Sequence, residues 1–168
     1  ETALTLFNDG STERMVRRVY LVNDPSQAES LHAMSVVLDP GLDIVENMEC
    51  VVIHDGTRSV IRENYRQPLS DPESRLYYNF EAMVMPLPAI EKGSIIDFHY
   101  TVKKSRDRES DSNFSEKITR SSPWKTLNLS MILSLPSDRR VRIHGRNLNP
   151  AAIRDEKTNG RRVISLSL

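Results

Sequence analysis

The clearest alternation of apolar and polar positions lies in the second half of the stretch Met83–Val102. There Ile96, Phe98, Tyr100 and Val102 alternate with Ile95, Asp97, His99 and Thr101. A period of two places one apolar and one mixed face on a half-buried strand. We therefore expect a core strand here, preceded by a turn that contains Pro88 and Gly93.

Similar apolar or β-branched stretches recur along the chain and are separated by residues that favour tight turns. The expected strands are Met15–Val22, Ser30–Leu38, Ile44–Ile53, Leu76–Met85, Leu127–Leu135, Ile153–Lys157 and Val163–Leu168, with shorter returns at Val60–Ile61 and Val141–Ile143. Hairpin turns are expected at Asn8–Ser11, at Asp55-Gly56 and at Asn159-Gly160, because glycine accepts positive φ without steric cost. In Leu127–Leu135 the odd-numbered positions are apolar, which predicts one long strand covering a core.

Two polar stretches interrupt this pattern. Glu63–Ser74 carries two prolines and predicts a surface loop, and the mixed-charge residues 103–117 predict a solvated connection. No convincing amphipathic helix and no repeat of fixed period is visible. Many short strands with hardly any helix predict an all-β fold, an antiparallel two-layer β-sandwich of immunoglobulin-like type, with an open barrel as the alternative.

Length and charge narrow the classes of protein that fit. A chain of 168 residues predicts a single domain over 1–168. Lys plus Arg and Asp plus Glu number 23 each, so no excess positive charge favours the binding of nucleic acid. No apolar run reaches the roughly 20 residues that a membrane helix needs. Because the chain starts at Glu1 without a methionine or a signal peptide, we expect it to be a piece of a longer protein.

Four segments carry a resemblance to a known family by their order and spacing. They are RRVYLVND, the turn His54-Asp55-Gly56, the stretch MPLPAIEKGSIIDFHYTV, and SSPWKTLNLSMILSLPSDRRVRI. From about Gly10 to Ile143 the chain resembles the bacterial domain of unknown function that lies N-terminal to transglutaminase-like domains in exported multidomain proteins. Pro88, Gly93 and Pro136 match the markers of that family, whereas His54 stands where the family usually has proline.

The resemblance implies a β-sandwich that has no catalytic residues and no cofactor of its own. The cysteine, histidine and aspartate of a transglutaminase-like site would belong to a downstream domain, which is the implied partner. The resemblance also implies a location in the periplasm or cell envelope.

The reactive side chains give no independent sign of catalysis. Cys50 lies within an apolar strand, where cysteine behaves as a small hydrophobe, and we expect it to be structural. The four histidines, His32, His54, His99 and His144, lack the spacing of metal ligands, so no metal site is predicted. The basic residues between Lys103 and Arg108 are interrupted by Asp107, which indicates a solvated loop.

The candidate interaction surface consists of Tyr77, Tyr78, Trp124 and His54. Aromatic side chains in strands usually belong to the core, but flat rings also stack on sugars, and Trp124 follows Pro123 as a candidate anchor. Two hypotheses follow. The first is a non-catalytic accessory domain that packs against or positions a transglutaminase-like domain, and the alternative is a module that binds glycans or peptides of the cell envelope.

Overall fold

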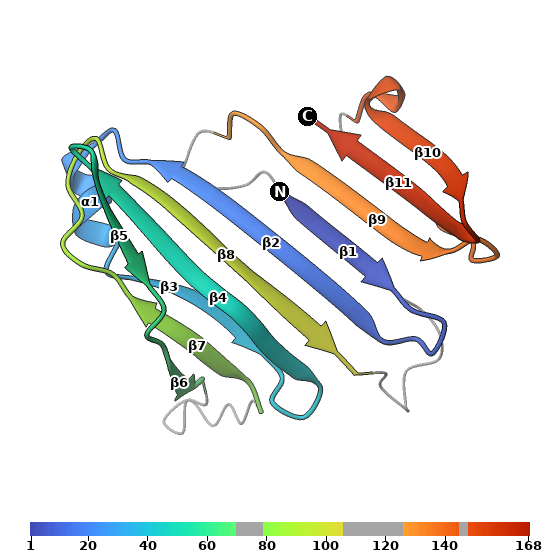
Figure 1. Ribbon diagram of the computed structural model, residues 1–168, viewed down its shortest axis with the longest axis horizontal. Coiled ribbons are helices and arrows are strands. Elements are labelled where there is room, and N and C mark those ends of the chain that lie inside the picture. The colour runs from blue at the N-terminus through green and yellow to red at the C-terminus, as the bar shows by residue number, and fades with distance from the viewer. Residues whose placement is uncertain (70–78, 106–125, 145–147) are drawn as a thin grey trace. The chain divides into compact units, whose positions relative to one another are not determined.

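The computed structural model describes residues 1–69, 79–105, 126–144 and 148–168. Strands form most of this part of the chain, so the predicted all-β class is confirmed (Figure 1). The chain divides into two compact units, one formed by Glu1–Met15 with Ser105–Leu168 and the other by Val16–Lys104.

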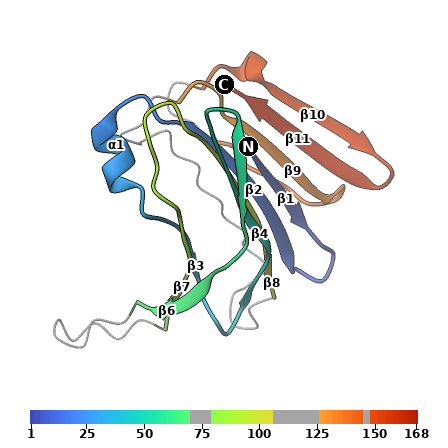
Figure 2. The ribbon, with the colours of Figure 1, turned by 60° about the vertical axis from the view of Figure 1, so that its left-hand side comes forward.

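The Val16–Lys104 unit contains two layers of strands. One layer has the order β2 (Thr12–Leu21), β8 (Ile95–Lys104), β4 (Asp43–His54) and β5 (Thr57–Ile61), and the border between the units falls within β2. The other layer is a three-stranded antiparallel sheet in the order β3 (Ala33–Leu38), β7 (Glu81–Pro86) and β6 (Tyr65–Pro68). Figure 2 shows β3, β7 and β6 on one side of β2, β8 and β4.

The core of this unit follows the alternation along β8. Ile96, Phe98, Tyr100 and Val102 are buried, and the neighbouring β4 contributes Cys50 and Val52 on the same face. The second layer adds Met34, Val36 and Leu38, the alternate residues of β3. The alternate residues that do not face this core lie on the opposite face of β2, β8, β4 and β5. We call this face the outer face. The prediction of a core strand at Ile96–Val102 is confirmed.

Positive backbone φ angles occur at the turns that glycine signals predicted. Asp55 and Gly56 have φ of 46° and 76° and join β4 to β5 as a two-residue hairpin, with His54 opposite Thr57. Asn159 and Gly160 have φ of 48° and 73° and join β10 (Ile153–Thr158) to β11 (Arg161–Ser167). Phe7 N–H donates to Ser11 O at 2.9 Å and closes the turn after β1 (Thr2–Leu6).

Gly93 holds the turn before β8 in a conformation that other residues rarely adopt. Its φ is 92°, and its N–H donates to Val22 O at 2.7 Å. We expect Gly93→Ala to lower the free energy of unfolding by about 1–2 kcal/mol, because an L side chain is strained at this φ although the space is open. Gly41→Ala is the matched control, since Gly41 lacks a positive φ and its added Cβ would meet Asp39 Oδ1 at an ordinary 3.4 Å. Equal losses in urea unfolding would contradict the backbone explanation.

The other unit contains a mixed sheet in the order β10, β11, β9 (Ser130–Pro136) and β1. β1 runs parallel to β9, with Leu4 opposite Leu133, so the prediction of purely antiparallel pairing is wrong at this point. Two strands of the same sheet can be parallel when a long stretch of chain connects them, as here between β1 and β9. The core cluster of this unit is Leu4, Leu133, Leu135 and Ile164.

Some element boundaries differ from the predictions. A six-residue helix, α1 (Pro25–Ser30), begins where Asp24 accepts from Ser26 N–H at 2.8 Å and Pro25 occupies the first turn. The expected loop from Glu63 contains β6, which is held by antiparallel pairing to β7. β9 begins only at Ser130, and Leu127 is 80% exposed. No strand forms at Val141–Ile143, and a single 3-10 turn, η1 (Pro150–Ala152), precedes β10.

Candidate functional site

Among the four residues of the candidate interaction surface, the structure describes only His54. Tyr77, Tyr78 and Trp124 lie outside the described residues. His54 was expected to be exposed in a turn, but it is the last residue of β4 and its side chain is 31% exposed. Its imidazole contacts residues from two connections of the Val16–Lys104 unit.

The imidazole of His54 lies between a serine and two carboxylates. Its Nδ1 is 3.2 Å from Ser94 Oγ, and its Nε2 is 3.4 Å from Glu91 Oε2 and 3.5 Å from Asp55 Oδ2. Glu91 N–H donates to Ser94 Oγ at 3.2 Å, which leaves the serine proton free to be donated to Nδ1. This network assigns the proton of a neutral His54 to Nε2, facing the carboxylates.

A serine, a histidine and carboxylates within hydrogen-bond reach resemble the composition of a hydrolytic triad, but the geometry argues against this role. A nucleophile must reach its substrate, whereas Ser94 is only 1% exposed. The backbone of Ser94 is also fixed, because its O accepts from Val22 N–H at 2.9 Å and its N–H donates to Glu91 O at 3.1 Å. We interpret the His54 cluster as a structural link between the turn after β4 and the turn before β8.

Cys50 is the single cysteine of the chain and is fully buried in β4. Burial, assisted by the nearby negative charge of Asp97, raises the pKa of its thiol to about 11. A thiol with this pKa is not a nucleophile near neutral pH. The prediction that Cys50 is structural agrees with its place in the core.

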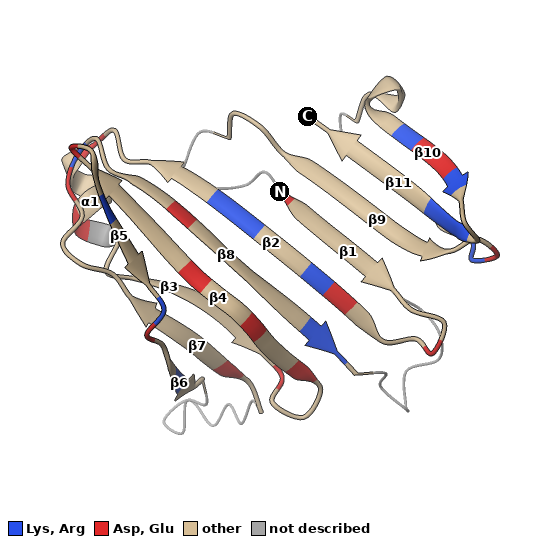
Figure 3. Cartoon of the chain, in the orientation of Figure 1, with Lys and Arg blue, Asp and Glu red and all other residues tan. Residues whose placement is uncertain are grey.

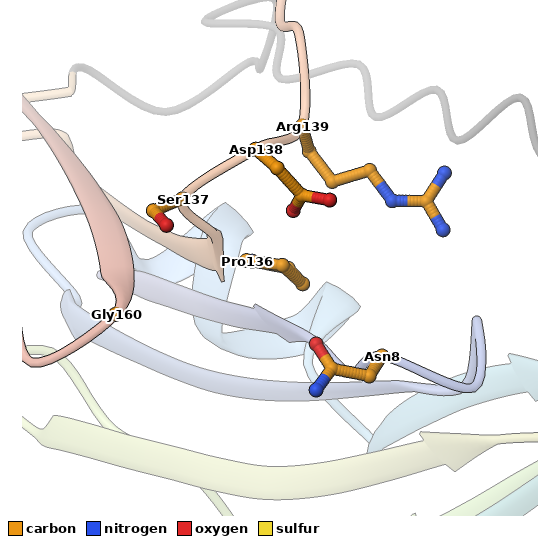
Figure 4. Close-up of a pocket in the computed structure, with 6 residues that line it drawn as sticks. All are labelled: Asn8, Pro136, Ser137, Asp138, Arg139 and Gly160. Atoms are coloured by element: carbon orange, nitrogen blue, oxygen red, sulfur yellow. The ribbon is translucent and has the colours of Figure 1, made fainter.

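A polar hollow lies in the unit formed by Glu1–Met15 and Ser105–Leu168, where three turns meet. Its volume is about 380 Å³, and its lining residues are Asn8, Pro136, Ser137, Asp138, Arg139 and Gly160. Figure 4 shows the side chains of Asp138 and Arg139 extending toward the same side, with the amide of Asn8 nearby. Ser137 N–H donates to Gly160 O at 3.1 Å and fixes two of the three turns.

The side chains around this hollow offer both signs of charge and an amide. A guanidinium, a carboxylate and an amide together supply donors and acceptors for a ligand with hydroxyl, carboxylate or amide groups. The sequence predicted the turns at Asn8–Ser11 and Asn159-Gly160, but it had no signal that would bring them together with Pro136–Arg139.

Neither a metal site nor a membrane helix appears in the part of the chain that the structure describes. Within 1–69, 79–105, 126–144 and 148–168, no group of three or more His, Cys, Asp or Glu side chains is arranged to hold a metal ion. In the same ranges no helix is long and apolar enough to cross a bilayer.

The described part of the chain forms a β-sheet module, and comparison with known proteins gives its family. The model of the family described as "Domain of Unknown Function with solved-structure structure (DUF3857)" matches residues 8–168. The chain therefore belongs to the DUF3857 family. Comparison with the curated proteins gave no match.

Among solved structures, the chain is similar to a protein from Parabacteroides distasonis ATCC 8503 that is described as a putative protease. The TM-score is 0.79 at 18% sequence identity, and the match covers 99% of this chain and 34% of the other. At this identity the similarity shows a shared fold. The chain spans about a third of the length of the protein that it matches.

Proposed function

We propose that this chain is a non-catalytic accessory module of a longer exported protein, in which it packs against or positions a transglutaminase-like domain of the cysteine protease fold. The observation that carries the proposal is the structural match, in which nearly the whole chain corresponds to 34% of a protein described as a putative protease. The burial of Ser94 and Cys50 adds support, because the two candidate nucleophiles are withdrawn from solvent. We further propose that the protein is located in the periplasm or cell envelope. The proposed arrangement of its strands is an immunoglobulin-like sandwich.

The test uses the complete natural polypeptide that contains this chain. Amide hydrolysis and transamidation are measured for the parent and for Cys50→Ala and Ser94→Ala. We expect both variants to keep the parent activity, because neither side chain is part of a catalytic site. A loss of turnover in a variant whose circular dichroism is unchanged would overturn the proposal.

The second candidate function is binding of envelope glycans or peptides, and the polar hollow between the three turns favours it. The ligand would contact the guanidinium of Arg139 and the carboxylate of Asp138. None of the lining residues of the hollow is among Tyr77, Tyr78, Trp124 and His54, the candidate interaction surface that the sequence indicated.

Calorimetric titration with soluble cell-wall fragments tests this second function. If the hollow binds them, Arg139→Ala should weaken binding by about tenfold, since a charge-assisted hydrogen bond contributes roughly 1.5–3 kcal/mol. Arg140→Ala is the matched control, because Arg140 is the next residue along the chain and does not line the hollow. Absence of heat with the parent protein, or equal effects of both substitutions, would exclude binding at this hollow.

A further inference from the structure

The outer face of the Val16–Lys104 unit carries a continuous group of apolar side chains. Val19 and Leu21 in β2 are 59% and 50% exposed, and Val60 in β5 and Ile95 in β8 are each 38% exposed. Ile53 in β4 is half-buried beside them. We call these five residues the apolar band.

The members of the apolar band share a face because side chains alternate along each strand. Val16 in β2 and Val22 directly after this strand are buried and belong to the opposite alternate set from Val19 and Leu21, and in β8 Ile96 is fully buried beside Ile95. Val19, Leu21 and Ile95 therefore point away from the core. The second layer, with β3, β7 and β6, lies on the opposite side of these strands (Figure 2).

Strand pairing makes the band contiguous. Ile53 lies opposite Ile95 in the β4–β8 pair. Val60 lies opposite Val51 in the β4–β5 pair, and Val51 is two residues before Ile53 on the same face, so Val60 is the diagonal neighbour of Ile53. Leu21 is adjacent to Val22, whose N–H donates to the O of Ser94, the residue before Ile95. The band thus crosses the sheet from β2 to β5.

Most charged side chains on the same face neutralise one another. Arg17 donates two hydrogen bonds to Asp97, with Nε 2.9 Å from Oδ1 and Nη2 2.7 Å from Oδ2. These bonds hold the pKa of Asp97 below its ordinary value. Arg62 pairs with Glu49, and Lys103 Nζ is 2.7 Å from Glu46 Oε2.

Figure 3 shows that the ends of β2, β8 and β4 nearest β5's hairpin are uncharged, while the paired charges lie further along the strands. Arg58 is the exception at the edge. It lies opposite Ile53 in β5, and no ion pair to it is formed among the described residues. The surface therefore has an apolar centre and one basic group on its rim.

A contiguous apolar patch on a soluble domain marks an interaction site more often than scattered apolar residues do. We propose that the apolar band is the surface on which a second folded domain of the same polypeptide docks, through an apolar face that carries one carboxylate, opposite Arg58. This inference rests on the proposed function, and it specifies the surface that the accessory module uses.

One observation and one physical argument favour a tethered domain over a second copy of the chain or a diffusible ligand. The match covers 34% of the chain of the Parabacteroides distasonis protein, so this fold occurs within a polypeptide about three times as long. A tethered partner also has an effective concentration of roughly millimolar, so that a small apolar patch suffices for docking. The neutralised charges mean that the partner needs few charged groups of its own.

The experiment is side-chain footprinting with a photoactivated carbene on the complete natural polypeptide. In the docked state we expect Leu21 and Ile95 to be labelled much less than Val37, which is 56% exposed on β3 of the second layer. Val19→Glu should raise the labelling of Leu21 and Ile95 to the level of Val37, because burying an unpaired charge weakens docking by about tenfold or more.

Val37→Glu is the matched control, since it places the same charge at an equally exposed valine outside the band. It should leave the labelling of Leu21 and Ile95 unchanged. Both variants replace exposed residues, and circular dichroism verifies that each remains folded.

Three results would overturn the inference. Strong labelling of Leu21 and Ile95 in the parent shows that the band is open. Weak labelling together with a doubled mass in light scattering shows that a second copy covers it. Weak labelling that disappears when small ligands are dialysed away shows a diffusible ligand.

The same experiment separates this inference from the proposed function. If chemical crosslinks join residues 1–168 to the rest of the polypeptide while the band stays labelled, the accessory role stands and the docking surface is elsewhere. If no part of residues 1–168 is crosslinked or protected, both proposals fail.

Discussion

Replacing Phe98 by alanine is expected to lower the free energy of unfolding by about 3–5 kcal/mol, the range for removing a fully buried aromatic side chain. Phe98 is 0% exposed in the middle of β8, and its ring lies 5.3 Å from the ring of Tyr100 at an angle of 44°. The substitution removes this contact and leaves a cavity that the two layers cannot close completely. Urea unfolding followed by circular dichroism measures the loss.

The control for this prediction lies three residues earlier on the same strand. Ile95 occupies the outer face and is partly exposed, so Ile95→Ala should cost less than about 1 kcal/mol. If both substitutions had equal effects, the assignment of the two faces of β8 would be wrong.

Alkylation of Cys50 at pH 8 is expected to be at least about 100-fold slower in the folded protein than in the unfolded chain. The pKa of the thiol rises from 9.0 to about 11, so the reactive thiolate is correspondingly scarce. Complete burial of Cys50 slows access further. The measurement compares iodoacetamide modification with and without denaturant, by mass spectrometry. Rapid modification under native conditions would show that β4 opens locally.

The same pKa shift makes stability depend on pH in the alkaline range. The folded state holds the thiol proton up to about pH 11, whereas the unfolded state releases it near pH 9.0. The protonated thiol therefore contributes its full share to the free energy of unfolding below pH 9, and this share is lost as the pH rises toward 11. The loss is about 2–3 kcal/mol. Cys50→Ala removes this dependence while other groups still titrate, so identical pH profiles for parent and variant would contradict the assignment.

The elements that the sequence predicted well are those with a local signal. The alternation from Ile96 to Val102 identified β8, and Asp55-Gly56 and Asn159-Gly160 identified two hairpins because each supplies positive φ. α1 was missed because six residues are too few for an amphipathic pattern, although Asp24 followed by Pro25 is a helix-start signal. β6, with the sequence YRQP, has no alternation of apolar and polar residues and forms through its pairing with β7, which no local pattern reports.

Long-range pairing limited the prediction of the topology and of the site in the same way. The parallel pairing of β1 with β9 joins residues more than 120 positions apart, and nothing in either strand specifies its direction. His54 was identified as a candidate residue, but Ser94, which its Nδ1 contacts, lies 40 residues away. The polar hollow likewise combines Asn8, Asp138 and Gly160, which lie far apart in the sequence and share no local pattern.

The edges of the two layers differ in their resistance to aggregation. β6 ends at Pro68, which has no N–H to donate to a further strand, and β5 carries Arg58, with Arg62 directly after its end. β3, with the sequence AMSVVL, is the other edge of the small layer and has neither a charge nor a proline. When the protein is concentrated or partly unfolded, intermolecular strand pairing is therefore expected to begin at β3, and a lysine at the exposed position of Val37 would discourage it.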